Sequence, residues 1–269
     1  MDKESFIISN FNNKFIGDDG AVINEWVYSK DIFIENTHFK KHWLSSYEIG
    51  RKAVMINISD AIVMNAEPKF ILLGLMIPRN MSHSSLKELT SGIKDACEKY
   101  HIKVIGGDTI SSDLLGVSVS VISYAKKPIY RDVKCGELLA YSGSLGGSLK
   151  SLKALQRGAK VGRNSRFRDV QLRDKFFYKN AKFINSAMDI SDSLKSDIPK
   201  FIGKNSVKFS RKFKIFEFNS GEEYELLISF DKKNKKRLLN EAKKSRISLT
   251  IFGEVIKGRY KRHGKFEHF

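Results

Sequence analysis

Cysteine is scarce in this sequence, because only Cys97 and Cys135 occur among 269 residues. Cys97 falls within a helical pattern, and Cys135 stands beside a glycine that indicates a turn. Two such cysteines provide neither a disulfide framework nor a Cys/His ligand set for zinc. We therefore expect no disulfide-stabilised fold, and a cytoplasmic location fits.

Long apolar runs are also missing. The longest, such as Phe70 to Met76, is far shorter than the ~20 residues that a membrane-spanning helix needs. The opening residues Met1 to Glu4 do not resemble the start of a signal peptide. With 19 Phe, 9 Tyr and 2 Trp, the composition is that of a folded chain. We expect a soluble protein without membrane association.

The sequence contains neither of the usual glycine-rich nucleotide fingerprints. Neither G-x-x-x-x-G-K-[ST] nor G-x-G-x-x-G occurs, although Leu138 to Gly147 reads as a strand entering a glycine turn. No cysteine or serine with a nearby histidine motif suggests a catalytic nucleophile. A nucleotide site, if present, must be built in another way.

Charge is divided unevenly along the chain. The net charge is +18, and residues 1–149 hold equal numbers of basic and acidic residues, so the excess lies in residues 150–269. Its lysines, such as those within 232–237, are not interleaved with aromatic residues as in nucleic-acid-binding motifs. We favour a solvated lysine-rich surface that also helps to attract polyanionic substrates. Nucleic-acid binding by this half is the alternative.

The expected elements indicate a mixed α/β or α+β fold without a Rossmann repeat. We expect strands within 15–39 and at 70–77, 103–105, 117–122, 138–142, 224–229 and 247–252, and helices at 84–100 and 231–245. Residues 47–66 begin like a helix, but the rest of this range could be helix or strand. The character of the sequence changes near Pro128. This predicts an N-terminal domain of residues 1–127 and a C-terminal domain of residues 128–269.

The stretch from Ala187 to Leu194 is predicted to pass from a strand into a helix. Asp189 and Ser191 point to the same face of an extended chain, and Asp192 falls where a helix N-cap would lie. A structural interpretation is available, in which Asp192 caps the helix and Asp189 only ends the strand. The catalytic interpretation depends on other acidic residues in the chain.

Three further apolar runs are expected to be strands that end on carboxylates, namely 15–19, 54–60 and 104–109. If these ends converge with Asp189, two charges ~4 Å apart cost roughly 4 kcal/mol at an effective dielectric near 20, so the cluster requires cations. Oxygen ligands without paired Cys or His favour a hard ion, and Mg²⁺ is often shared between carboxylates and substrate phosphates. The pattern predicts a magnesium-nucleotide site. Ordinary structural roles for His38 and Arg131 remain open at this point.

Six motifs in order give the chain a resemblance to the thiamine-monophosphate kinase family, within the superfamily of aminoimidazole ribonucleotide synthetase and selenophosphate synthetase. They cover essentially the full chain, and each is weak alone. The motifs are Gly17 to Val22, Asp31 with His38-Phe39, Asn57 to Ala61, Gly106 to Thr109, Met188 to Asp192 and Gly221 to Leu227.

The resemblance implies a two-domain fold like that of aminoimidazole ribonucleotide synthetase, with a mixed N-terminal sheet that has helices on one face. It implies a homodimer that transfers the γ-phosphoryl group of ATP to thiamine monophosphate, in thiamine diphosphate biosynthesis. Residues carried over as ligands of several Mg²⁺ ions are Asp19, Ser29, Asp31, Asp60, Asp108, Asp189 and Asp192. Those carried over for ATP are Gly107, Arg131 and Ser191, and those for the thiamine moiety are His38, Glu222 and Phe266.

The chain departs from the family pattern at four positions. Lys30 stands where a small hydroxyl residue is usual, Ser193 replaces a glycine, and Ser220 and Glu223 replace Gly and Asp. An ammonium at Lys30 would displace one metal or replace its charge.

The reaction implied by the resemblance needs no general base, because the acceptor is already an anionic phosphate oxygen. Transfer then depends on positioning and on electrostatic stabilisation by metal ions. The alternatives are another ATP-dependent synthetase of the superfamily or a nucleic-acid-binding protein. A selenophosphate synthetase would call for a reactive cysteine in an N-terminal glycine-rich segment, and Cys97 lies far from such a place.

Overall fold

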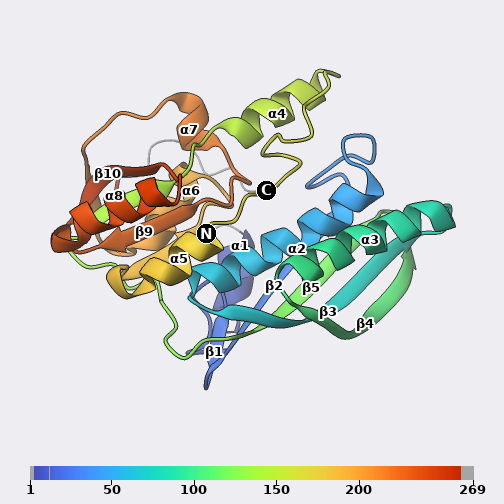
Figure 1. The fold of residues 1–269 in the computed structure, drawn as a ribbon, viewed down its shortest axis with the longest axis horizontal. Helices are drawn as coiled ribbons and strands as arrows, with labels where there is room; N and C mark the ends of the chain where they lie inside the picture. Colours follow the sequence, from blue (N-terminus) through green and yellow to red (C-terminus); the bar gives the residue numbers. More distant parts are fainter. Residues whose placement is uncertain (1–2, 12, 262–269) are drawn as a thin grey trace.

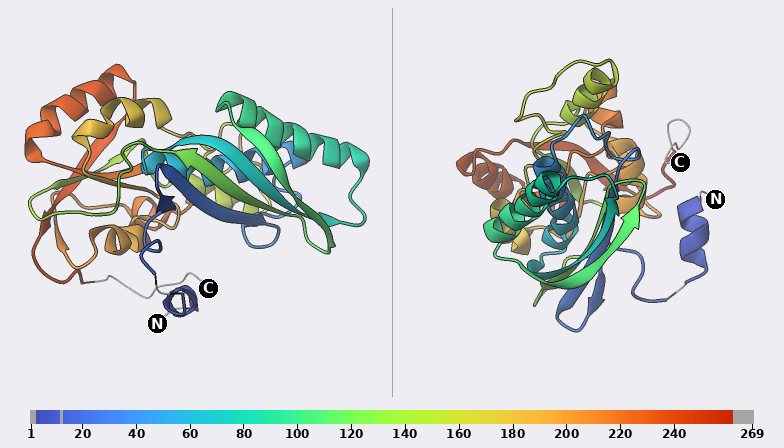
Figure 2. Two further views of the ribbon diagram at one scale, coloured as in Figure 1. Left: turned by 90° about the horizontal axis from the view of Figure 1, so that it is seen from below. Right: turned by 90° about the vertical axis from the view of Figure 1, so that its right-hand side faces the viewer.

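The computed structural model describes residues 3–11 and 13–261 (Figure 1). Two five-stranded sheets form its frame, one from each half of the chain, and helix α2 (Ser46–Val63) runs between them (Figure 1). Helix α1 (Lys3–Ser9) lies apart from both sheets (Figure 2). The expected mixed α/β architecture is confirmed.

The first sheet has the order β1-β2-β5-β3-β4. Only the β3–β4 pair is parallel, and the other pairs are antiparallel. Helices α2 and α3 (His83–Lys99) cover one face of this sheet, as predicted (Figure 2). The strands are β1 (Ala21–Ile23), β2 (Trp26–Ile34), β3 (Glu67–Pro78), β4 (Lys103–Ser112) and β5 (Gly116–Tyr124).

Helix α2 begins at a capping box, in which Ser45 and Glu48 satisfy each other's backbone N–H groups. Its central part is apolar on every side, which is typical of a fully buried helix. Two glycines permit its close crossing with α3. A Cβ atom at Gly50 would lie 2.1 Å from the Leu89 carbonyl oxygen, and one at Gly92 would lie 2.0 Å from that of Tyr47.

The second sheet has the order β7-β9-β6-β10-β8, and all its pairs are antiparallel. Its strands are β6 (Leu138–Ser142), β7 (Ser186–Asp189), β8 (Ser206–Phe209), β9 (Leu226–Phe230) and β10 (Leu249–Ile256). Its helices are α4 (Gly147–Gln156), α5 (Asp174–Asn180), α6 (Leu194–Ile202), α7 (Ile215–Asn219) and α8 (Lys235–Lys244), with two short 3₁₀ turns, η1 (Ala181–Phe183) and η2 (Lys232–Asn234).

The C-terminal end of α2 connects the two halves. Ile62 and Val63 are buried in one apolar cluster with Phe177 and Ile228 of the second half. The last turn of α2 is therefore held against β7, which brings Asp60 close to the strand that ends at Asp189. The domain boundary near residue 127 stays a prediction.

Three expectations about carboxylates at strand ends were wrong. Residues 15–19 form turns and bends before β1, so Asp19 does not end a strand. Asp60 lies in helix α2, because the apolar run 54–60 is a buried helix and not a strand. Asp108 lies in the middle of β4, which continues through Gly106 and Gly107 to Ser112. Short apolar runs do not separate buried helices from buried strands. The strand-to-helix passage from β7 into α6 is confirmed.

None of the helices in the described part of the chain combines the length and apolar character that crossing a membrane requires.

Candidate active site

Three carboxylates from three separate elements meet where the two halves touch. Asp19 precedes β1, Asp60 lies in the last turn of α2, and Asp189 ends β7. One oxygen of each lies within 4.8 Å of the others. The Oδ2 atom of Asp189 is buried without a hydrogen-bond partner in the described structure. These oxygens fit a hard divalent cation, as the sequence predicted.

Polar groups of α2 orient two of the neighbouring acidic residues. The side chain of Asn57 donates to the Ala53 carbonyl oxygen (2.7 Å) and accepts from the backbone N–H of Asp31 (2.6 Å). The hydroxyl of Ser59, one residue before Asp60, donates to Asp189. A single buried helix therefore places Asp60 and fixes the two strands that carry Asp31 and Asp189.

Burial and mutual repulsion make these carboxylates weak acids in the absence of cations. Burial, followed by the charges of Asp19 and Asp192, raises the pKa of Asp31 to about 6. Burial, followed by the charge of Asp19, raises the pKa of Asp189 to about 7. Burial, with the charges of Asp31 and Asp189, also raises the pKa of Asp60 well above its ordinary value. A bound cation would reverse these shifts, because it favours the ionised form.

Arg131 supplies the positive charge that faces this cluster. Its guanidinium forms a bidentate pair with Asp19, and its backbone N–H donates to Asp18 (2.7 Å). Burial raises the pKa of Asp19, and Arg131 opposes that effect. The structure thus brings Arg131, predicted as an ATP contact, to the carboxylates that are predicted to bind metal.

A cavity of about 540 Å³ opens over the cluster. Asp192 lies in its wall and pairs with Lys200 of α6 (2.6 Å). Most of the residues that the sequence singled out line this cavity. They are Asp19, Lys30, Asp31, His38, Asp60, Arg131, Ser191, Asp192 and Glu222. Some residues from each predicted set, for metal, nucleotide and thiamine, therefore line one cavity, and Asp189 of the cluster is not in its lining.

Three predicted residues belong neither to the carboxylate cluster nor to the lining of its cavity, and a fourth lies outside the described residues. Ser29 is buried, and its hydroxyl donates to the Asn57 carbonyl oxygen (3.4 Å). Gly107 and Asp108 lie on β4, the edge strand of the first sheet, where both are exposed. Phe266 is outside the described residues. The roles of all four stay predictions.

A smaller cavity of about 280 Å³ adjoins the first, and His38 and Glu222 line both. The His38 Nδ1 atom accepts from the backbone N–H of Ile34 (3.1 Å), so the neutral ring carries its proton on Nε2. Burial lowers the pKa of His38, which keeps the ring neutral at pH 7. The side chains of Trp43 and Phe167 supply aromatic walls. This space suits a flat ring with hydrogen-bonding edges.

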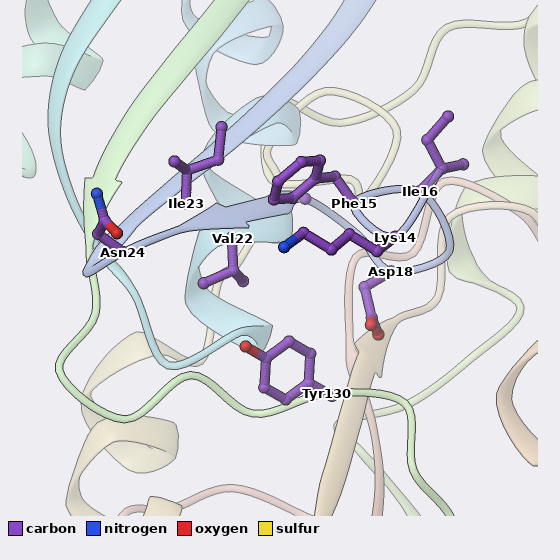
Figure 3. A pocket seen from close by; sticks show the side chains of 9 residues that line it. Lys14, Phe15, Ile16, Asp18, Val22, Ile23, Asn24 and Tyr130 are labelled. Carbon is purple, nitrogen blue, oxygen red and sulfur yellow. The ribbon is translucent and has the colours of Figure 1, made fainter. Parts of the chain in front are cut away.

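A third cavity of about 340 Å³ lies beside the site and shares only Asp18 with the main cavity. Figure 3 shows Lys14, Phe15 and Asp18 of the segment before β1 facing Tyr130. Among residues 3–11 and 13–261, no predicted site residue lines this space.

Three of the four departures from the family pattern have partners of their own. The Lys30 ammonium donates to the hydroxyls of Ser118 (2.7 Å) and Ser120 (3.3 Å) on β5. The Ser220 hydroxyl donates to Glu223 (2.5 Å), which also accepts the backbone N–H groups of Gly146 and Ser148. Ser220 and Glu223 therefore hold the start of α4.

The fourth departure, Ser193, is strained. Its φ of 137° and ψ of 159° belong to a region that essentially only glycine occupies. The side chain still caps α6, because its oxygen accepts from the Ser196 N–H (3.4 Å). The true N-cap is therefore Ser193, and the prediction that Asp192 fills this position was wrong.

Replacing Ser193 by glycine is expected to stabilise the protein. Such backbone strain costs about 1–3 kcal/mol, whereas exchanging a serine cap for glycine costs only a few tenths. A gain of about 1 kcal/mol would raise Tm by about 2–4 °C, measured by calorimetry. Ser196→Gly, in ordinary helical conformation, is the matched control and should lower Tm. A Ser193→Gly variant that melts no higher than the original would contradict the strain argument.

Several site residues were missed by the sequence analysis. Asn57 and Ser59 act within motifs that were recognised, but neither was singled out as a site residue. Lys200 pairs with Asp192 from two turns further along α6, and no local pattern indicates that pair. Lys52 is a buried basic residue directly before the apolar run of α2, and that contrast is a signal that could have been used.

Comparison with known proteins agrees with the motifs. Residues 17–125 match the family described as AIR synthase related protein, N-terminal domain. The thiamine-monophosphate kinase of Buchnera aphidicola subsp. Schizaphis graminum is 31% identical over 280 residues, covering 90% of this chain and 84% of that protein.

Solved structures show the same fold. Thiamine monophosphate kinase from Aquifex aeolicus has a TM-score of 0.83 at 23% identity, with coverage of 96% of this chain and 93% of that chain. AaThiL complexed with AMPPCP and TMP has a TM-score of 0.86 at 24% identity, with coverage of 99% and 96%. From the sequence match to the Buchnera enzyme and this shared fold, the chain belongs to the thiamine-monophosphate kinase family.

Proposed function

We infer that this protein transfers the γ-phosphoryl group of ATP to thiamine monophosphate and so forms thiamine diphosphate. The observation that carries this inference is the meeting of Asp19, Asp60 and Asp189 beside a cavity that shares the lining residues His38 and Glu222 with a smaller cavity. An acidic site for metal-bound polyphosphate thus adjoins a space for a flat ring. The kinase relatives, including one in complex with AMPPCP and TMP, support the same assignment.

The carboxylates would hold Mg²⁺, with Asp19, Asp60 and Asp189 as the innermost ligands and Asp31 and Asp192 beside them. Bound Mg²⁺ would neutralise the repulsion between two polyphosphates and the charge that develops in the transition state. Arg131 adds a fixed positive charge at the same place, and Ser191 offers a hydroxyl at the cavity wall. These groups orient ATP.

Transfer in this site is direct and in line. The acceptor phosphate is already anionic, so no residue has to remove a proton from it. What the chain provides is alignment of donor and acceptor, since the cavity over the carboxylates and the smaller cavity share His38 and Glu222 as lining residues. His38 Nε2–H and a Glu222 oxygen would contact the thiamine ring portion, with Trp43 as an aromatic wall. Phe266 remains a proposed further contact.

A homodimer is proposed from the uncovered face of the first sheet. Ile32, Leu72 and Ile110 are 48%, 39% and 54% exposed, and their register places them on the face opposite α2 and α3. Asp108 lies on the same face, three strands from Ile32. A metal role for Asp108 would therefore require that a second copy presents it.

We expect light scattering at micromolar protein to give the mass of a dimer. Ile110→Lys places a charge in the apolar face and should shift the mass toward that of a monomer. Lys94→Ile, on an exposed position of α3, is the control and should leave the mass unchanged. A monomeric parent protein would count against the dimer.

ADP release with different acceptors tests the proposed function. Thiamine monophosphate should stimulate Mg²⁺-dependent ADP release, and selenide should not. Stimulation by selenide alone would instead favour another synthetase of the superfamily. Filter binding to RNA and DNA at two salt concentrations tests the nucleic-acid alternative, which the basic second half motivates. We place the reaction in the cytoplasm.

A further inference from the structure

Lys52 is a buried cation that the proposed reaction does not use. It lies on α2 two turns before Asp60, and only 1% of it is exposed. Its Nζ atom donates to the Phe167 carbonyl oxygen (2.9 Å) and to Glu222 Oε2 (2.6 Å). The same atom lies 4.4 Å from the ring centroid of Phe167 and 5.3 Å from that of Phe33. An ammonium is buried only with such compensation, so its position is tightly defined.

Glu222 is held in an equally defined place. Its backbone occupies the left-handed region at φ 52°, and its N–H donates to the Ser191 carbonyl oxygen (2.6 Å). The Lys52 ammonium donates a hydrogen bond to Oε2 of the carboxylate. Within the described residues, no protein donor is hydrogen-bonded to Oε1. Because Glu222 lines both cavities, one oxygen remains available to a ligand.

The pairing changes what Glu222 can recognise. A free carboxylate would attract the thiazolium cation by charge, but a carboxylate paired with a buried ammonium is close to neutral as a unit. Its remaining oxygen is better suited to accept one directed hydrogen bond from an N–H group, such as the exocyclic amine of the aminopyrimidine. Hydrogen-bonded recognition of this kind discriminates strongly against analogues that lack the donor.

Lys52 also fixes a second wall of the same space. Phe167, whose carbonyl oxygen it binds, lines the smaller cavity and packs edge-on against Trp43. The neighbouring Arg168 pairs with Glu48, and Asp169 pairs with Arg51, so the segment is also tied to the part of α2 that precedes Lys52. Only Lys52, however, also contacts Glu222.

We propose that Lys52 is a positioning residue that sets specificity for the ring end of the substrate, by fixing Glu222 Oε1 and the Phe167 wall. This inference rests on the proposed function, since thiamine monophosphate is taken as the substrate. It predicts that loss of Lys52 weakens binding of thiamine monophosphate and leaves MgATP binding intact, because Lys52 does not line the metal cavity.

Calorimetric titration of the full chain with thiamine monophosphate, and separately with MgATP, tests the proposal. Lys52→Met should raise Kd for thiamine monophosphate at least about tenfold, the loss expected when a fixed hydrogen bond to a charged group is disordered, and change Kd for MgATP less than threefold. Arg51→Met is the matched control, because Arg51 pairs with the same segment through Asp169 without lining either cavity. It should leave both Kd values within threefold.

A second variant keeps the test decisive if Lys52→Met does not fold. Lys52→Arg retains the charge, but a planar guanidinium cannot reproduce the point contact, so it should show the same selective loss. Equal losses toward both ligands, or none, would overturn the proposal while the proposed function stands. If the unaltered protein binds MgATP but not thiamine monophosphate, the proposed function itself fails.

Discussion

Replacing Asp60 by asparagine is expected to lower the rate of thiamine diphosphate formation by roughly 10²–10³-fold or more, the range for loss of one preorganised electrostatic group. Asp60 contributes one of three oxygens within 4.8 Å, and its amide replacement binds Mg²⁺ poorly. Asp189→Asn should behave in the same way. Steady-state kinetics at saturating Mg²⁺ measures the loss.

Stability separates this loss from unfolding. In metal-free protein, removing one of three closely spaced, mutually repelling carboxylates should leave Tm unchanged or raise it. Asp113→Asn, at an exposed position between β4 and β5, is the control and should retain full activity. Near-normal turnover in either Asp60→Asn or Asp189→Asn would show that the carboxylate cluster is not the site.

The second large effect is a pH-dependent stabilisation by Mg²⁺. The raised pKa values of about 6 for Asp31 and about 7 for Asp189 mean that the metal-free folded protein binds more protons than the unfolded chain between about pH 4 and pH 7. The stability of the metal-free protein therefore falls as pH rises through this window. Mg²⁺ binds the ionised carboxylates, so its stabilising effect should grow over the same window.

Thermal unfolding in the presence and absence of Mg²⁺ measures this effect. At a concentration 100 times Kd, a ligand stabilises by about 2.7 kcal/mol, which corresponds to a rise in Tm of about 5–10 °C for a chain of this size. That shift is expected at pH 8 and should be much smaller at pH 5.5. KCl at matched ionic strength should not reproduce it. An equal Mg²⁺ shift at both pH values would contradict the assignment of these carboxylates as ligands.

Much of the site was predictable from the sequence because its parts are local. Asp189 ends a strand and Ser191 follows it within one short motif, and the chain direction there is set by β7 and α6. The same holds for Asp19, which lies two residues before the start of β1. Six such motifs in order were sufficient to predict the family and the reaction type.

The parts that could not be predicted depend on how distant segments pack. The helical state of Asp60 follows from burial of α2 between two sheets, and an apolar run alone does not reveal it. The pair Lys52–Glu222 spans 170 positions in the sequence. Its existence changes the expected role of Glu222 from attracting a cation to accepting one hydrogen bond. Only the fold supplies that information.

Direct phosphoryl transfer at the carboxylate cluster is tested most directly by following the terminal phosphate of ATP. Purified protein would be incubated with γ-labelled ATP, Mg²⁺ and thiamine monophosphate, and the products would be separated by chromatography. We expect the label in thiamine diphosphate, in equal amount to the ADP formed, with no transfer when EDTA removes the metal. Label that appears only as inorganic phosphate, or that stays in ATP while the protein is folded, would contradict the account.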